Sequence, residues 1–274
     1  MIMKSRISKI LILSLVLVML FGTVYAYAFE SYDTYTYSID GQPLKSPPAY
    51  TPAREVSYSD MDLSRLGITG ALANLNAPTD IVTDNEGNVY IVDRGNNRIV
   101  VLNKYYTVQT IIDSYEDDQK HMQTFSAPNG IFVTDPTITA NGESYIYICD
   151  TNNERIVIFD RDYKYVRTIS KPDSALVTSF KLDAIAVDKY GRIFAVSSQF
   201  DEGVIVMSSE GDFTGFIGAQ KVTYSILDVI WKRFQSREQR ENQAKNISYP
   251  YNNITVDSDG FVYVTSSEVP ANKQ

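Results

Sequence analysis

Residues 80–102 read DIVTDNEGNVYIVDRGNNRIVVL, and two phrases of this stretch return further along the chain. The first phrase is an apolar strand that ends on Asp, and it occurs four times, at 81–84, 131–135, 185–188 and 254–257. The second phrase, at 90–102, is repeated at 147–159 together with its Asp-x-x-Asn-x-Arg turn. A segment that recurs in this way cannot bury its own hydrophobic face and must stack on its neighbours.

Alternation of apolar residues and the turn chemistry place four short strands in the first unit, at 80–83, 89–93, 98–103 and 107–112. Gly87 follows Asp84 by three residues, and the same offset recurs after Asp188 and Asp257. A glycine there supplies a positive φ, and the Asp side chain bonds the turn amides, so we expect turn-holding Asp residues rather than calcium ligands. Four antiparallel strands per repeat predict an all-β fold, a β-propeller of about three and a half blades, at 77–112, 127–169, 180–220 and, in part, 249–274.

Two segments interrupt the repeats. Residues 136–142 lengthen the turn after the second Asp-ended strand. The fourth such strand lies 69 residues beyond the third, whereas the earlier spacings are 51 and 53. Residues 221–246 contain no Gly or Pro and carry apolar residues at helical spacing opposite a basic side, which predicts an amphipathic helical insertion. We expect it to pack on its parent domain; the alternatives are a partner-protein surface and an anionic membrane.

The first 28 residues have the layout of a secretory signal. Lys4, Arg6 and Lys9 precede an almost wholly apolar run at 10–21, and Ala26-Tyr27-Ala28 supplies a small-x-small cleavage site. We predict an exported protein that is either secreted, with a mature chain from near Phe29, or anchored on the outer face of the cytoplasmic membrane. The anchor, which is the alternative, would contact the membrane through residues 10–28.

Residues 29–56 are polar, rich in Tyr and broken by four prolines, which predicts an extended, hydrogen-bond-free arm. The folded propeller domain is expected over 57–274. Residues 54–75 are expected to supply an outer strand to a closing blade.

The composition limits the function classes. The 274-residue chain has a net charge of −8 and becomes more acidic once the leader is removed, so binding of nucleic acid has no electrostatic support. The single cysteine, Cys149, excludes an intrachain disulfide and a cysteine-based zinc cluster, and it reads as a small buried hydrophobe. The single histidine, His121, lies in a polar run and reads as an exposed surface residue. Asp93 with Arg98, and Asp150 with Arg155, read as structural ion pairs across a turn rather than as catalytic groups.

The two phrases, with the Pro-x-x-Ile openings at Pro78 and Pro128, resemble NHL-repeat β-propeller proteins, and the leader, arm and insertion resemble the exported NHL proteins of Gram-positive bacteria. The resemblance covers residues 77–267. It implies a ring that commonly has six blades, so we expect Gln274 to end part-way through a propeller. It also implies a link to a carbohydrate uptake system.

The residues that open each innermost strand are expected to ring the mouth of a central channel; these channel-mouth residues are Asp80, Asn129, Asp183 and Asn253. They predict a non-enzymatic extracytoplasmic scaffold that binds a protein or a small hydroxylated ligand, with no catalytic residue, metal site or cofactor. The alternative is a gluconolactonase-like or other propeller hydrolase or lyase that uses a divalent metal. A zinc lyase with several His ligands is excluded by the single histidine.

Overall fold

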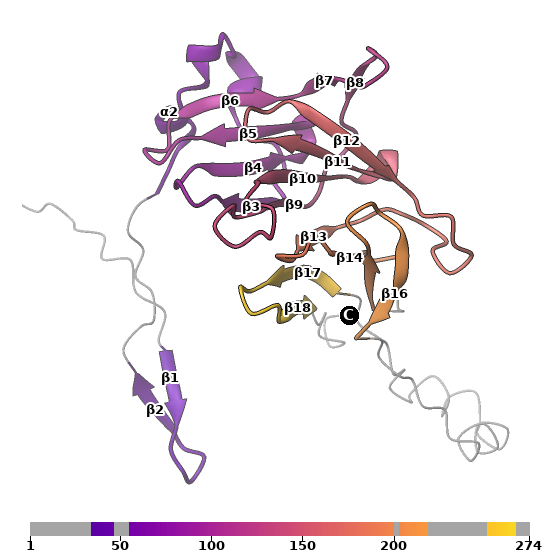
Figure 1. The fold of residues 1–274 in the computed structure, drawn as a ribbon. Coiled ribbons are helices and arrows are strands. Elements are labelled where there is room, and N and C mark those ends of the chain that lie inside the picture. The colour runs from indigo at the N-terminus through magenta and orange to yellow at the C-terminus, as the bar shows by residue number, and fades with distance from the viewer. Residues whose placement is uncertain (1–33, 47–54, 200–202, 219–250, 267–274) are drawn as a thin grey trace, which may run out of the picture. The chain divides into compact units, whose positions relative to one another are not determined.

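The computed structural model describes residues 34–46, 55–199, 203–218 and 251–266. The chain divides into two compact units, residues 1–55 and 56–274. In the first unit, strands β1 (Thr34–Tyr37) and β2 (Pro43–Ser46) form an antiparallel hairpin (Figure 1). The predicted leader at 1–28 and the predicted helical insertion at 221–246 lie outside the described residues.

This hairpin differs from the extended, hydrogen-bond-free arm expected over 29–56. Its turn is fixed by Ser38, whose hydroxyl oxygen accepts hydrogen bonds from the amides of Asp40 at 3.3 Å and Gln42 at 3.1 Å. Gly41 supplies the positive φ of 74° that the turn requires. Pro43 is compatible with pairing because it is the first residue of its strand, while the other three prolines lie outside the described residues.

The second unit consists mainly of four-stranded antiparallel sheets, in each of which the strands are bonded in chain order (Figure 1). We call them blades 1 to 3. Blade 1 is β3 (Asp80–Thr83), β4 (Val89–Asp93), β5 (Arg98–Leu102) and β6 (Val108–Ile112). Blade 2 is β9 (Ile131–Val133), β10 (Tyr145–Asp150), β11 (Arg155–Asp160) and β12 (Tyr165–Ser170). Blade 3 is β13 (Ala184–Val187), β14 (Ile193–Val196), β15 (Val204–Met207) and β16 (Phe213–Ile217). The described part of blade 4 is β17 (Tyr251–Val256) and β18 (Val262–Ser266). The predicted fold class is confirmed.

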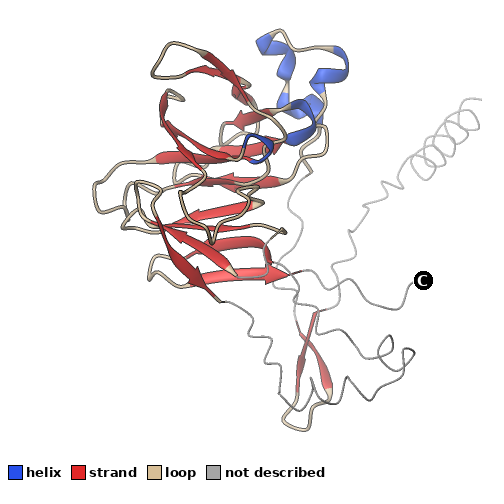
Figure 2. Ribbon diagram, turned by 90° about the vertical axis from the view of Figure 1, so that its right-hand side faces the viewer, coloured by secondary structure: helices blue, strands red, loops and turns tan. Residues whose placement is uncertain are grey.

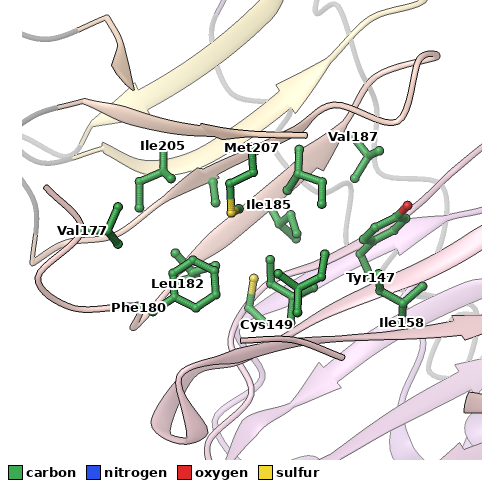
Figure 3. Packing of buried hydrophobic residues seen from close by; sticks show 14 residues of the cluster. Tyr147, Cys149, Ile158, Val177, Phe180, Leu182, Ile185, Val187, Ile205 and Met207 are labelled. Carbon is green, nitrogen blue, oxygen red and sulfur yellow. The ribbon is translucent and has the colours of Figure 1, made fainter. Parts of the chain in front are cut away.

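Hydrophobic side chains fill the space between successive blades. In β10, Tyr147 and Cys149 point to the blade 3 side, and Ile146 and Ile148 point to the blade 1 side. Figure 3 shows the layer between blades 2 and 3, where Cys149 and Ile158 face Ile185 and Met207. Because side chains alternate along a strand, one central strand supplies apolar surface to two interfaces. The expectation that each blade shields its neighbour is thereby met.

Short helices cover the free face of blade 1, where an outer strand was expected from residues 54–75. They are α2 (Tyr58–Met61) and the 3-10 turns η1 (Leu63–Leu66) and η2 (Gly70–Ala73). Figure 2 shows these helices gathered at one end of the stack of sheets. Met61 and Leu63 pack on Val100 of blade 1. The expectation of a strand was wrong because Ser57 and Asp60 form a capping box, which starts a helix.

A further hairpin lies between blades 1 and 2. It consists of β7 (Ser114–Glu116) and β8 (Met122–Thr124), and the sequence patterns did not predict it. Tyr115 on β7 is buried against Phe125 and Phe159, with ring centroids 5.7 Å and 5.2 Å away. The two remaining 3-10 turns, η3 (Arg94–Asn96) and η4 (Thr151–Asn153), connect the second and third strands of blades 1 and 2.

The innermost strands of blades 2 and 3 approach each other closely at Gly130. A Cβ atom on Gly130 would lie 2.7 Å from the Ala184 Cα and 2.8 Å from the Asp183 carbonyl oxygen. Both are backbone atoms of the next blade, which cannot move aside as the end of a side chain can. Glycine is therefore required here by the packing of one blade on another.

We predict that Gly130→Ala lowers the free energy of unfolding by about 3 kcal/mol, in the upper range for overpacking. The matched control is Gly260→Ala, where φ is 92° and no atom lies within 4 Å of the added Cβ. The control should lose only about 1 kcal/mol, from backbone strain. Urea unfolding of both variants measures the difference, and equal losses would contradict the close approach.

Candidate functional site

The Asp residues that end the innermost strands hold the turns that follow them. Asp84 Oδ1 accepts hydrogen bonds from the amides of Glu86 and Asn88, each at 2.9 Å, and Gly87 has a φ of 85°. Asp188 and Asp257 bond their own turns in the same way. Their other carboxylate oxygens accept from Arg192 Nε at 2.7 Å and from the Tyr263 hydroxyl at 2.8 Å. The structural role predicted for these Asp residues is confirmed.

The Asp-x-x-Asn-x-Arg motif of blade 1 ties the turn between β4 and β5 to the chain that precedes the blade. Asp93 is fully buried and its Oδ2 accepts from Arg98 Nε at 2.6 Å and Asn96 Nδ2 at 2.9 Å. Its Oδ1 accepts from the Asn76 amide at 2.6 Å, and Arg98 Nη2 donates to the Leu72 carbonyl at 2.7 Å. Every oxygen of this carboxylate is engaged in holding two segments together.

Blade 2 repeats the arrangement around Asp150. Its Oδ2 accepts from Arg155 Nε at 2.7 Å and Asn153 Nδ2 at 2.8 Å, and its Oδ1 accepts from the Ser126 amide at 2.7 Å. The turns also reach the next blade, since the Thr151 hydroxyl donates to the Leu182 carbonyl at 2.7 Å. The two ion pairs are therefore structural, as predicted.

The structure brings together three of the four channel-mouth residues. Asp80 Oδ2 accepts from the Ile131 amide of blade 2 at 2.9 Å, and Asn129 Nδ2 donates to Asp183 Oδ1 of blade 3 at 2.7 Å. These bonds run from one innermost strand to the next. Within the described part of the chain, Asn253 makes no side-chain hydrogen bond to these three residues, and its Oδ1 accepts from the adjacent Ile254 amide at 2.7 Å. Ligand binding at the mouth stays a prediction.

Burial raises the pKa of two acid groups near this mouth, Asp80 and Cys149. Desolvation raises the pKa of Asp80, and the bonds from the Ile131 and Ile81 amides oppose that rise. Cys149, which is fully buried beneath the mouth, has a pKa well above its ordinary value because of desolvation and the nearby Asp80 and Asp183 carboxylates. The thiol is therefore protonated at neutral pH and acts as a buried hydrophobe, as predicted. His121 is exposed, also as predicted, in the turn between β7 and β8.

A cavity of about 350 Å³ lies between blades 2 and 3, at the opposite end of their inner strands from the mouth. Asp183 precedes β13 and faces the mouth, while Asp188 follows β13 and lines the cavity. We call this cavity the interblade cleft. Three tyrosines, two cations and several small polar groups line it together with aliphatic residues: Thr134, Thr139, Ala140, Asn141, Tyr145, Tyr147, Ile158, Val166, Arg167, Val187, Asp188, Lys189, Tyr190, Gly191, Ser209 and Glu210.

One wall of the interblade cleft is the lengthened turn of blade 2. Residues 134–144 connect β9 to β10, and the Ala140 amide donates to the Lys189 carbonyl of blade 3 at 2.9 Å. The Ser144 hydroxyl donates to the Thr134 carbonyl at 2.6 Å and fixes the base of the turn. The cleft residues were missed from the sequence. The signal that could have located them is the extra length at 136–142.

The floor and rim of the interblade cleft differ in character. Tyr147, on the floor, is only 5% exposed, and desolvation is the main cause that raises the pKa of its hydroxyl. On the rim, the Tyr145 hydroxyl donates to the Glu143 carboxylate, which raises the pKa of Tyr145 to about 12. Both phenols are thus neutral hydrogen-bonding groups at physiological pH. The Arg167 guanidinium donates to the Ser209 carbonyl, and its Nη1 lies 3.6 Å from Glu210 Oε2.

The described residues contain no group of three or more His, Cys, Asp or Glu side chains that could hold a metal ion. They also contain no helix that is both long and apolar enough to cross a membrane.

The sheets and their turns define an all-β protein built from propeller blades. Residues 75–102, which comprise the first three strands of blade 1 and the segment leading into them, match the family model of the NHL repeat. The chain thus contains an NHL repeat among propeller-type blades, which confirms the resemblance stated from its sequence. No curated protein matches the chain.

Several solved structures are similar to the chain at low identity. Virginiamycin B lyase from Staphylococcus aureus is 12% identical, with a TM-score of 0.39 over 86% of this chain and 57% of that chain. Hydrazine synthase from Kuenenia stuttgartiensis is 10% identical, with a TM-score of 0.45 over 72% and 44%. A protein of unknown function from Bacteroides caccae is 12% identical, with a TM-score of 0.38 over 51% and 48%. The chain thus spans about half the length of these structures.

We predict that Arg98→Met lowers the free energy of unfolding by about 3 kcal/mol, because it leaves the buried Asp93 carboxylate without its cation. The matched control is Arg161→Met, which removes an exposed ion pair with Glu86 and should cost less than about 1 kcal/mol. Chemical denaturation of both variants gives the comparison. A loss at Arg98 no larger than that at Arg161 would argue against a structural role for the motif.

Proposed function

We propose that the protein is a non-enzymatic, extracytoplasmic scaffold that binds a small hydroxylated ligand or a protein through loops of its propeller blades. The observation that carries this proposal is the use of the motif side chains. Asp93, Asp150 and Asp188 are buried and have their carboxylate oxygens engaged by backbone amides and arginines. A carboxylate held in this way positions a chain segment and is poorly placed to act as a general base.

The interblade cleft supports a ligand-binding role rather than a purely structural one. Its volume of about 350 Å³ lies within the range of roughly 300–1,000 Å³ that is typical of small-molecule sites. Such sites combine aromatic walls with a few polar groups, and this cleft has three tyrosines beside Arg167 and Lys189. The link to carbohydrate uptake, which the family resemblance implies, stays a prediction.

The first test separates binding from catalysis. We expect the full chain to melt at a higher temperature with a bound saccharide or peptide, and to show no turnover of a sugar lactone with or without calcium. Thermal shift and a lactone hydrolysis assay on the same preparation measure both properties. Calcium-dependent lactone turnover would support the metal-dependent hydrolase and contradict the scaffold.

The second test addresses export. Expressed in a Gram-positive bacterium, the chain should be digested by protease added to intact cells or be recovered from the medium. Where the leader is cleaved, mass spectrometry should find a mature terminus near Phe29. Deletion of residues 10–21 is the control and should leave the protein inside the cell. Protection of the full chain from external protease, together with its absence from the medium, would contradict export.

A further inference from the structure

The floor of the interblade cleft carries a polar group that the fold does not use. Tyr147 is 5% exposed, and within the described part of the chain its hydroxyl has no hydrogen-bond partner. Figure 3 shows the ring reaching from blade 2 toward Val187 of blade 3, with its oxygen at the tip. Both residues line the cleft. The hydroxyl is open to the space of the cleft, so it can bond a ligand atom placed there.

The rim of the cleft supplies a donor and an acceptor side by side. Arg167 Nη1 lies 3.6 Å from Glu210 Oε2, beyond hydrogen-bonding distance, so each group can bond a ligand atom placed between or above them. Glu210 is three-quarters exposed and Arg167 is one-third exposed, which makes their mutual attraction weak. The pair is electrically neutral as a whole.

The side walls of the cleft present flat apolar surface. Val166 and Ile158 lie on the blade 2 side, and Tyr190 stands at the edge of the blade 3 turn with 65% of its surface exposed. Lys189 and Arg192 lie over the Tyr190 ring, 5.5 Å and 5.9 Å from its centroid, and hold it in place. An aromatic ring of this kind packs against the C–H face of a ligand ring.

We propose that the interblade cleft binds a small neutral polyhydroxylated ligand, a mono- or disaccharide, with the Tyr147 hydroxyl, the Arg167 guanidinium and the Glu210 carboxylate bonding its hydroxyl groups. This inference rests on the proposed scaffold function and names its site. A sugar hydroxyl both donates and accepts, which matches a phenol on the floor and a donor–acceptor pair on the rim. A neutral ligand leaves the Arg167–Glu210 pair balanced, whereas a charged ligand would be attracted by one member of the pair and repelled by the other.

The test is isothermal titration of the full chain with glucose, galactose, mannose, N-acetylglucosamine, maltose and lactose, and with glucuronate and glycylglycine as charged probes. We expect at least one neutral saccharide to bind saturably. Tyr147→Phe should weaken that binding about 5- to 10-fold, because it removes one hydrogen bond. Arg167→Gln should weaken it at least about 10-fold.

The matched control is Tyr115→Phe. Tyr115 is also a buried tyrosine between two blades, and its hydroxyl has no hydrogen-bond partner in the described part of the chain. It lies in the layer between blades 1 and 2, away from the cleft. This variant should keep the affinity of the unaltered protein. A separate variant, Asn129→Ala, tests the channel mouth, where ligand binding stays a prediction.

The pattern of binding among these variants and probes separates three claims: the site in the cleft, the class of ligand and the scaffold function. Loss of saccharide binding in Tyr147→Phe and Arg167→Gln alone supports the cleft. Loss in Asn129→Ala with unchanged cleft variants overturns the cleft but retains the scaffold with its ligand at the mouth. Binding of glucuronate or glycylglycine but of no neutral saccharide overturns the ligand class. If no probe and no protein partner binds, the proposed function itself fails.

Discussion

The burial of both faces of each central strand is the constraint on which the rest of this structure depends. β10 is a run of six residues of which Ile146 and Ile148 enter one interblade layer and Tyr147 and Cys149 enter the other. Neither layer exists without the neighbouring sheet, because a single four-stranded sheet has nothing to cover its apolar faces. Stability therefore depends on the contact between blades as much as on the hydrogen bonds within each blade.

Polar and charged side chains at the ends of the strands fix the spacing and register of the stacked sheets. The carboxylates of Asp93 and Asp150 bind an arginine, an asparagine and a backbone amide of the preceding segment. At the channel mouth, Asp80 and Asn129 extend hydrogen bonds from one innermost strand to the next. The carboxylates and arginines of the motif could be taken for catalytic candidates from the sequence, but here they are engaged in structural bonds. Buried charges are stable only when they are paired.

The elements that repeat were predictable from the sequence, and the elements that do not repeat were not. The strands of blade 1 follow from alternation and from the Asp84 and Asp93 turns, where local chemistry and the global fold agree. The hairpin of β7 and β8 was missed because its polar strands are held by one buried tyrosine, Tyr115, whose contacts are tertiary. The helices at 58–73 were mistaken for a strand because their amphipathic pattern is too short to show a period.

The interblade cleft also lies where the chain departs from the repeat. Where the turn after the innermost strand is tight, as at Asp84 to Asn88, it lies close to the sheet and leaves no wall. In blade 2 the turn is lengthened, and the bond from the Ala140 amide to the Lys189 carbonyl carries it across to blade 3. A wall on one side and the Tyr190 turn on the other then enclose space above Tyr147. In a repeat protein, a departure from the repeat adds an element that stacking does not require, so it is the place where binding can be built without loss of the fold.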